Sequence, residues 1–552
     1  MSPIAVIGWA VFAYALLRGL RYLFVVRVFL TCAHREAQGT RITPQQLEPG
    51  QLELLTLLDE PLAAAGFRHL GYLQTTPVVT YAGKPLPCSV FVNDVIPAYA
   101  FVRPRVSPAA GAVADLQIQT TLESGISVAT FNSPTSLAFM PPDVRPVADP
   151  ARSIPDLVEL HQYHLAYAST DSNPVEHTGL DDALERLLAS LGGLRTHFRE
   201  RRWTVATADS SLDRYTLWGA CVLTRKSFLA IGARGRRTKS QGVPQTISSE
   251  KDRRLLVEAD LLAVLSMAEH PETAPGTPWP LMTVIAATAL LSWVAMDWVW
   301  NAYVATLVLA AVAFHEGGHA LAMRLFGYRD VHVFFVPMLG AMTVGRSVTA
   351  SVRDRLAMLL AGPTPGLWLG LLLAAIDQAW FPSFWLRAAA RVLLILNGLN
   401  LLPFTPLDGG RALELLGRPE SVWRLVVHAA SAVGLVTLAV ITHDPVLIAI
   451  GVFWTALFPR QWQSWQLRRL VAGRITHRTD FREVARATLE TLASQPRYAA
   501  WRAANRQATA RVLGREFSEA AATSADRAWG VIAYASAWIP VGAWFLLNPP
   551  AL

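Results

Sequence analysis

Two histidines and a glutamate lie within five consecutive residues of a strongly apolar segment. Residues 314–320 read Phe-His-Glu-Gly-Gly-His-Ala, so His315 and His319 are four positions apart and Glu316 follows the first. On a helix this spacing projects both imidazoles from one face, where they can hold one metal ion while Glu316 takes a proton from water. The pattern is typical of a zinc hydrolase. The alternative is a polar patch for helix packing, although unpaired polar groups in an apolar span are costly.

A second motif supplies a further ligand. Catalytic zinc is commonly held by three protein groups, with a fourth position left for water. Residues 400–411 read Asn-Leu-Leu-Pro-Phe-Thr-Pro-Leu-Asp-Gly-Gly-Arg, where the prolines break a helix and the glycines permit a tight turn. We expect irregular backbone here to turn Asp408 back toward the helix bundle. Asp-Gly-Gly alone is a common loop end, but beside a motif that lacks one ligand it predicts Asp408 as the third.

Together the two motifs resemble those of the site-2 protease family of intramembrane zinc metalloproteases. The resemblance covers about residues 281–458. It implies that His315, His319 and Asp408 bind one Zn²⁺ per chain and that Glu316 is the general base. It also implies a multi-span α-helical core that hydrolyses peptide bonds of membrane-anchored protein substrates within or beside the bilayer.

Three further features are similar to parts of that family. Asn400 resembles its asparagine near the substrate strand, which makes Asn400 a possible substrate-binding residue. Residues 331–342 occupy the place of its membrane-associated strand, which can pair with an extended substrate. The segment Ala-Gly-Pro-Thr-Pro-Gly366 resembles its Gly-Pro motif, with glycine where asparagine is frequent. Because Gly362, Gly366 and Gly370 recur every four residues, we interpret them as helix-packing positions.

Apolar runs that could position these motifs fill the second half of the chain. They cover residues 281–300, 302–326, 356–376, 386–404, 425–441 and 446–458, and a last run covers 529–547. About 20 apolar residues cross the roughly 30 Å hydrocarbon core of a bilayer. With 52% hydrophobic and 16% charged residues, the chain is predicted to be an integral membrane protein with about six transmembrane helices in residues 276–458.

The chain ends carry further predicted membrane segments. Residues 4–17 are apolar and are followed by Arg18, Arg21 and Arg27. Because the basic residues follow the apolar run, a short anchor over residues 1–30 with its N-terminus outside is favoured over a cleaved signal peptide. An amphipathic surface helix is the alternative. Toward the other end, residues 459–528 form a polar, Arg-rich helical segment before a C-terminal transmembrane helix in residues 529–552.

Residues 31–275 have the composition of a soluble domain, predicted to be α+β. Strand-like runs lie at residues 89–93 and 215–223, and helical runs lie at 180–191 and 252–267. The basic residues 234–239 are interpreted as a solvated turn. His161 and His164 are interpreted as surface histidines, since no third ligand lies near them. The cysteines are odd in number and widely spaced, which argues against a disulfide framework or a cysteine zinc cluster: Cys32, Cys88 and Cys221.

The basic residues predict an orientation in the membrane. The net charge of +8 is explained by the concentration of Lys and Arg in cytoplasmic segments, and no basic stripe interleaved with aromatics points to a nucleic-acid partner. We expect a multi-pass protein of the bacterial inner membrane with cytoplasmic soluble domains. Arg387 and Arg391 fit less well, because they begin a span from the outer side, where they either snorkel or pair within the bundle.

Two other functions are compatible with the same motifs. One is a membrane-embedded zinc peptidase that acts on soluble peptides gathered by the cytoplasmic domain. The other is a non-catalytic scaffold or transporter in which the motifs hold helices together. The sequence does not identify the substrate.

Overall fold

The computed structural model describes most of the chain and divides it into two compact units. The described residues are 18–19, 21–76, 78, 85–104, 114–132, 140, 143–148, 153–169, 172–240, 250–266, 279–299, 301–336, 340–346, 350–405, 407–443, 445–477, 480–499, 501, 503–519 and 521–547. Those within 1–281 and 485–512 form the first unit, and those within 282–484 and 513–552 form the second unit. The predicted anchor at residues 4–17 lies outside the described residues, and residues 21–30 are helical.

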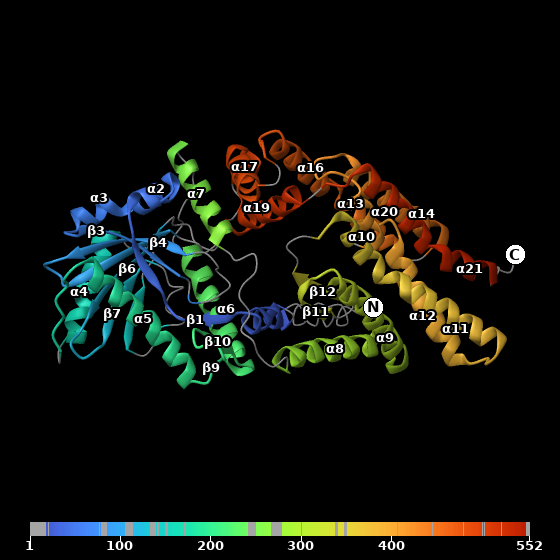
Figure 1. The fold of residues 1–552 in the computed structure, drawn as a ribbon, viewed down its shortest axis with the longest axis horizontal. Helices are drawn as coiled ribbons and strands as arrows, with labels where there is room; N and C mark the ends of the chain where they lie inside the picture. The colour runs from blue at the N-terminus through green and yellow to red at the C-terminus, as the bar shows by residue number, and fades with distance from the viewer. Residues whose placement is uncertain are drawn as a thin grey trace. The chain divides into compact units, whose positions relative to one another are not determined.

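A seven-stranded sheet is the framework of the first unit (Figure 1). Neighbours along the chain are neighbours in the sheet, and every pair is antiparallel except β7 and β8. The strands are β2 (Gly39–Ile42), β3 (Arg68–Thr75), β4 (Leu86–Asn93), β5 (Ala98–Pro104), β6 (Ala114–Thr121), β7 (Ser127–Phe131) and β8 (Val144–Ala148). The predicted strand at residues 89–93 is confirmed as part of β4.

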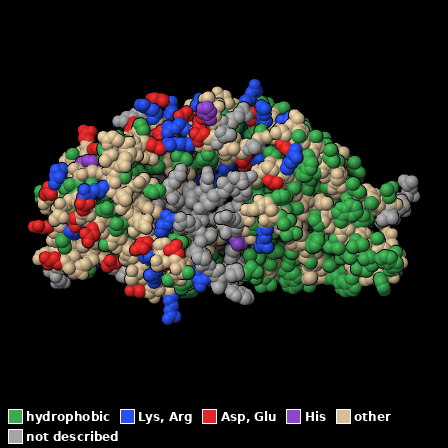
Figure 2. Space-filling model, viewed as in Figure 1, with side chains coloured by type: hydrophobic (Ala, Val, Ile, Leu, Met, Phe, Trp, Pro, Cys, Tyr) green, Lys and Arg blue, Asp and Glu red, His purple; other side chains and the backbone are tan. Residues whose placement is uncertain are grey.

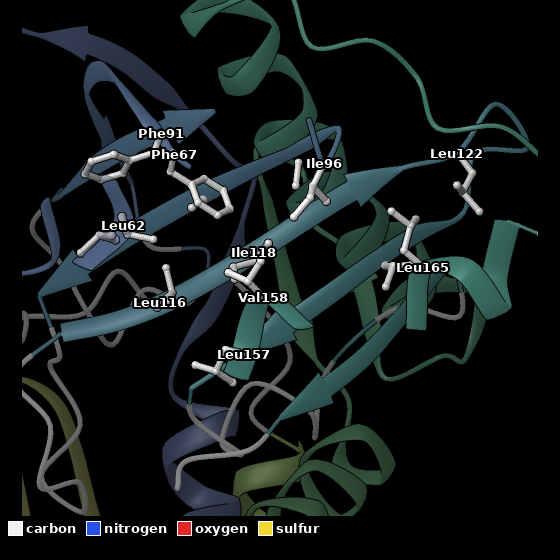
Figure 3. Close-up of a cluster of buried hydrophobic side chains, with 14 residues drawn as sticks. Leu62, Phe67, Phe91, Ile96, Leu116, Ile118, Leu122, Leu157, Val158 and Leu165 are labelled. Carbon is white, nitrogen blue, oxygen red and sulfur yellow. The ribbon is translucent and has the colours of Figure 1, made fainter. Parts of the chain in front are cut away.

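Helices cover both faces of this sheet, because successive residues of a strand point to opposite sides. On one face, α3 (Asp59–Ala64) and α4 (Ile154–Ala168) contribute side chains such as Leu62 and Leu157 to the apolar cluster in Figure 3. On the other face, α5 (Leu180–Glu200) packs against β3, β4 and β5. The predicted helix at residues 180–191 is confirmed and continues to Glu200. Strands and helices together make this unit α+β.

His161 is buried, so the interpretation of it as a surface histidine was wrong. Its side chain on α4 is 0% exposed, and its ring nitrogens each lie 3.0 Å from a threonine hydroxyl, of Thr120 on β6 and Thr130 on β7. Burial lowers the pKa of His161 to about 4. The two threonines reach the ring only after the sheet has formed, which is why sequence spacing did not reveal the contact.

The predicted strand at residues 215–223 is instead a junction between a strand and a helix. β10 (Leu212–Tyr215) ends there, in a three-stranded sheet with β1 (Ala33–Arg35) and β9 (Thr204–Ala206), and α6 (Leu217–Ser240) follows. A short apolar run fits either structure, and here Leu223 is buried from a helix against Trp203 and Tyr215. The basic residues 234–239 continue α6, so the predicted turn there was also wrong.

Helices from distant parts of the chain complete the first unit. The helix predicted at residues 252–267 is α7 (Glu250–Ser266), on which Asp260 is buried. Its carboxylate accepts hydrogen bonds from Arg506 Nε at 2.7 Å and from the Gln507 amide at 2.8 Å. Both partners belong to α19 (Ala503–Ser518). The remaining helices of this unit are α2 (Pro49–Leu55), α18 (Pro496–Ala499) and the short 3₁₀ turns Pro44–Gln46 and Thr56–Leu58. The unit also contains α17 (Phe481–Ser494) from Ala485 on and α19 up to Val512.

The second unit is helical apart from one β-hairpin. Its helices are α8 (Trp279–Val299), α9 (Ala302–Leu325), α10 (Val352–Ala361), α11 (Pro363–Ala379), α12 (Phe384–Leu401), α13 (Asp408–Leu415), α14 (Trp423–Thr442), α15 (Pro445–Ala456), α16 (Phe458–Ala472), α20 (Ser524–Ala537) and α21 (Ile539–Leu547), and its strands are β11 (Arg329–Val336) and β12 (Gly340–Arg346). The last apolar run, predicted as one transmembrane helix, is divided between α20 and α21.

Three helical stretches of the described chain are long and apolar enough to cross a membrane. They are Ala302–Leu325, Val352–Ala379 and Phe384–Leu401, and shorter apolar helices occupy Ile285–Val294 and Trp423–Thr437. Figure 2 shows apolar side chains crowding the surface over α11 and α12, where Trp368, Leu372 and Trp385 are exposed. Because a soluble protein rarely exposes so large an apolar surface, this surface suggests contact with lipid.

One of the two unexplained arginines is paired. Arg387 at the start of α12 donates to the Asp377 carboxylate at the end of α11 over 2.9 Å, and Asp377 also accepts from the Ser383 backbone at 2.7 Å. This ion pair joins the two helices at the turn between them. Of the alternatives that the sequence left for Arg387, pairing is observed, but at the turn between two helices and with the Arg387 side chain 53% exposed.

Candidate metal centre

Helix α9 carries the His-Glu-x-x-His motif as predicted. Asn301 caps its first turn by accepting a hydrogen bond from the Val304 backbone at 2.9 Å. Helical spacing then places His315, Glu316 and His319 together, and all three side chains are buried. The motif therefore points into the second unit.

The second glycine of the motif permits a close helix contact. A Cβ atom at Gly318 would lie 2.1 Å from the carbonyl oxygen of Ala361, whereas one at Gly317 would meet nothing within 4 Å. Gly362 in turn faces the His319 ring, at 2.3 Å from a Cβ position to Nε2. The absence of side chains at Gly318 and Gly362 therefore lets α9 approach the junction of α10 and α11.

Asp408 reaches the two histidines from the first position of α13. The backbone before it is irregular, as predicted, but Gly409 and Gly410 are helical and do not form the expected turn. Their Cβ positions would lie 2.1 Å from the Leu401 carbonyl oxygen and 2.3 Å from the Phe404 carbonyl carbon. The glycines are needed because the start of α13 packs directly on the chain that leads into it.

Three predicted ligands converge at one point. His315 Nε2 lies 3.1 Å from Asp408 Oδ2, His319 Nε2 lies 3.2 Å from the same oxygen, and the two Nε2 atoms are 3.2 Å apart. The three side chains form a group that could hold a metal ion. Ligand atoms on a tetrahedron around zinc, with bonds of about 2.0–2.1 Å, lie roughly 3.3 Å apart. The spacing of the three atoms fits an ion of this size.

The outer nitrogens of both rings are occupied by hydrogen bonds. His319 Nδ1 lies 2.7 Å from the carbonyl oxygen of Met358, and His315 Nδ1 lies 2.8 Å from Asn397 Oδ1. A carbonyl oxygen only accepts, so each Nδ1 carries the proton and each Nε2 presents a lone pair. Two lone pairs and a carboxylate then face one another in a buried space, an arrangement that a cation stabilises. The donor set, two imidazoles and a carboxylate, is one that zinc accepts.

The β-hairpin contacts the residue predicted as the base. Thr343 on β12 donates to Glu316 Oε2 at 2.5 Å, and its hydroxyl lies 3.2 Å from the Glu316 backbone oxygen. β11 and β12 are antiparallel, with Phe335 opposite Ala341 and Val336 opposite Gly340. The strand predicted at residues 331–342 is thus two strands, with residues 337–339 outside the described structure.

Two asparagines of α12 have different surroundings. Asn400 was predicted to bind substrate, and its amide donates to the Leu396 carbonyl at 3.0 Å; its role stays a prediction. Asn397, which lies outside both sequence motifs, is fully buried and contacts His315. The signal for it was a second polar residue one helical turn before Asn400 in an apolar run.

The repeated glycines of α11 pack as expected, with one addition. A Cβ atom at Gly370 would lie 2.9 Å from Leu394 on α12, which confirms a helix-packing role. A Cβ atom at Gly366 would lie 2.3 Å from the Asn397 amide nitrogen. Gly366 therefore makes room for a side chain that contacts a predicted ligand.

Comparison with known proteins finds partial similarity to three relatives. Stage IV sporulation protein FB of Bacillus subtilis is 30% identical over 140 residues, which are 25% of this chain and 46% of the relative. Putative zinc metalloprotease Rip3 of Mycobacterium tuberculosis is 32% identical over 184 residues, 31% of this chain and 44% of the relative. Zinc metalloprotease MJ0392 of Methanocaldococcus jannaschii is 25% identical over 116 residues, 20% of this chain and 33% of the relative.

These similarities support the site-2 protease family over part of the chain. No family model matches, and the chain spans less than half the length of each of the three relatives. Two of these relatives are named as zinc metalloproteases. Together with the three apolar helical stretches, they support a membrane protein of the zinc protease type.

Proposed function

We propose that the protein is an intramembrane zinc metalloprotease that hydrolyses peptide bonds of membrane-anchored protein substrates. The observation that carries the proposal is the convergence of His315 Nε2, His319 Nε2 and Asp408 Oδ2 within 3.2 Å of one another, inside a unit with an apolar surface. These three side chains would hold one zinc ion. When bound, zinc supplies a Lewis acid for the scissile carbonyl and lowers the pKa of water toward about 7.

The residues around the ion have separate tasks. Glu316 accepts the proton of the attacking water and passes it to the leaving amine, as a general base and then a general acid. Thr343 holds the Glu316 carboxylate by a hydrogen bond at 2.5 Å. Glu316 is buried, so its carboxylate is largely shielded from bulk solvent.

Substrate enters as an extended segment in this proposal. A helix hides its carbonyls in its own hydrogen bonds, so a transmembrane substrate must unwind before cleavage. The β11–β12 hairpin contacts Glu316 through Thr343, and an extended segment that paired with this hairpin would pass beside the base. Asn400 is proposed to contact the substrate. We further propose an inner-membrane location with cytoplasmic soluble segments, from the positions of Lys and Arg.

The decisive experiment replaces the base and keeps the ligands. Glu316→Gln removes the proton acceptor without changing side-chain size, so the purified variant is expected to bind zinc like the wild type and to leave a co-expressed single-span substrate uncleaved. His315→Ala is the matched control, since it should lose both zinc and cleavage.

Two results would contradict the proposal. Cleavage by Glu316→Gln at the wild-type rate would exclude the mechanism, and a purified wild type without zinc affinity would favour a scaffold.

Proteins that accumulate in cells carrying Glu316→Gln identify the substrate class. Membrane-anchored fragments are expected, whereas soluble peptides would support the alternative peptidase.

A further inference from the structure

Asn397 is a fully buried amide in the apolar helix α12, 0% exposed. A buried amide in an apolar span is costly unless its polar atoms are bonded. Both of its polar ends are bonded here. The nitrogen donates to the Leu393 carbonyl at 2.7 Å, and the oxygen lies 2.8 Å from His315 Nδ1.

The bond to Leu393 fixes the orientation of the amide. A backbone carbonyl can only accept, so the nitrogen of Asn397 must face Leu393 and the oxygen must face His315. The oxygen therefore accepts the Nδ1 proton, which leaves Nε2 of His315 as the unprotonated nitrogen beside Asp408 and His319. Rotation of the His315 ring would break this bond.

The packing of α11 against α12 leaves space for the Asn397 amide beside His315. Gly366 on α11 has no side chain, and a Cβ atom there would lie 2.3 Å from the Asn397 amide nitrogen, 2.6 Å from its carbon and 2.8 Å from its oxygen. Any larger residue at this position would displace the amide from His315. The small size of Gly366 thus serves helix packing and also leaves room for the amide that contacts His315.

We infer that Asn397 is a positioning residue for the metal centre, which sets the tautomer and ring orientation of His315. The inference rests on the proposed zinc function, because His315 is a ligand only in that function. Residues that orient histidine ligands typically change metal affinity about 10- to 100-fold when removed. Asn397 is expected to act on zinc affinity and not on proton transfer by Glu316.

The test measures zinc affinity of the purified full chain by competition with a chromophoric chelator. Asn397→Leu keeps the size of the side chain and removes the acceptor, and is expected to weaken zinc binding by about 10- to 100-fold. Asn397→Asp keeps an acceptor for His315 and is expected to bind zinc more tightly than Asn397→Leu. A packing role alone predicts the opposite order, because a buried carboxylate disturbs an apolar helix more than leucine does.

Asn400→Leu is the matched control. Asn400 lies on the same helix, and its amide also donates to the carbonyl four residues earlier, at 3.0 Å. Its replacement is expected to leave zinc affinity unchanged. Thermal unfolding of the zinc-free proteins checks that each variant is folded.

The outcomes separate this inference from the proposed function. Wild-type protein that binds no zinc contradicts the proposed function. If the wild type binds zinc, two results contradict only the role of Asn397. One is an Asn397→Leu variant with the zinc affinity of the wild type, and the other is an Asn397→Asp variant that binds zinc more weakly than Asn397→Leu.

Discussion

The side chain of Glu316 depends on a partner from another element. Its neighbours in the motif, His315 and His319, face Asp408, while the Glu316 carboxylate accepts a hydrogen bond from Thr343 on β12. A hydrogen bond to a charged group contributes roughly 1.5–3 kcal/mol. Loss of this bond would allow the carboxylate other rotamers, from which proton transfer is less favourable.

Thr343→Val is therefore expected to lower the cleavage rate by about 10- to 100-fold, the equivalent of roughly 1.5–3 kcal/mol. Valine keeps the branched shape and removes the donor. Zinc affinity should not change, since Thr343 does not contact a ligand atom in the described structure. Thr343→Ser retains the hydroxyl and should preserve most activity. Equal rates for the valine variant and the wild type would show that the hydroxyl is not needed.

At the scale of elements, two glycines allow α9 to pack closely against the α10–α11 junction. Gly318 meets the Ala361 carbonyl and Gly362 meets the His319 ring. Interiors are close-packed, so a methyl group added at such a contact displaces backbone. A side chain that pushed α9 away from the α10–α11 junction would therefore also move His319.

The two glycines within the motif provide a direct comparison. Gly318→Ala is expected to lower stability by about 1–3 kcal/mol through overpacking and to weaken zinc binding. Gly317→Ala meets nothing within 4 Å and is expected to be neutral or to stabilise the helix by up to about 1 kcal/mol. Thermal unfolding and chelator competition measure both effects. Two alanine variants with the same stability and zinc affinity would argue against the close contact.

At the scale of the whole molecule, each of the two units buries polar and charged side chains among its apolar residues. The second unit buries such side chains at the candidate metal centre, and it buries Asp377 in an ion pair with Arg387. The first unit buries ion pairs such as Asp260 with Arg506, and it also shields several histidines from solvent. Burial lowers the pKa of His34, His161 and His177 to about 4, from an ordinary value of 6.5.

These histidines predict acid sensitivity of the first unit. Below about pH 6.5 these histidines bind protons in the unfolded chain but not in the folded chain. The stability that they contribute therefore falls as the pH drops toward 4 and is constant above about pH 7. For fully buried His161 alone the loss is about 3 kcal/mol at pH 4. Hydrogen exchange of the backbone amides in β6 and β7 measures this loss of stability, once the exchange rates are corrected for their intrinsic dependence on pH.

Replacing the histidine tests its share of this effect. His161→Gln should be less stable than the wild type at pH 7, because one threonine contact is lost, but should show a flatter decline in acid. His164→Gln on the same helix is the control, since that ring is only partly buried. Its decline should stay close to that of the wild type, because burial, and not the charge of His164, is the main cause of the low pKa of His161. An unchanged pH dependence in His161→Gln would contradict the assignment.

The sequence by itself determined which residues form the candidate metal site and which segments are apolar enough for a membrane. His315, His319 and Asp408 could be selected because ligand types and helical spacing are local properties, and the apolar runs could be found because hydropathy is local too. Strand 89–93 and helix 180–191 were predicted for the same reason. Residues 215–223 were wrongly predicted as a strand, because a short apolar run suits a strand or a helix until its packing partners are known.

Only the tertiary structure decided which side chains meet. Asn397 and His315 are 82 residues apart, and Thr120 and His161 are 41 apart. Such contacts depend on how helices and strands pack, and on the space that Gly366 leaves on another helix. Spacing along the chain identified the proposed ligands of the metal, while packing between elements supplied the groups that contact the two histidines and the proposed base.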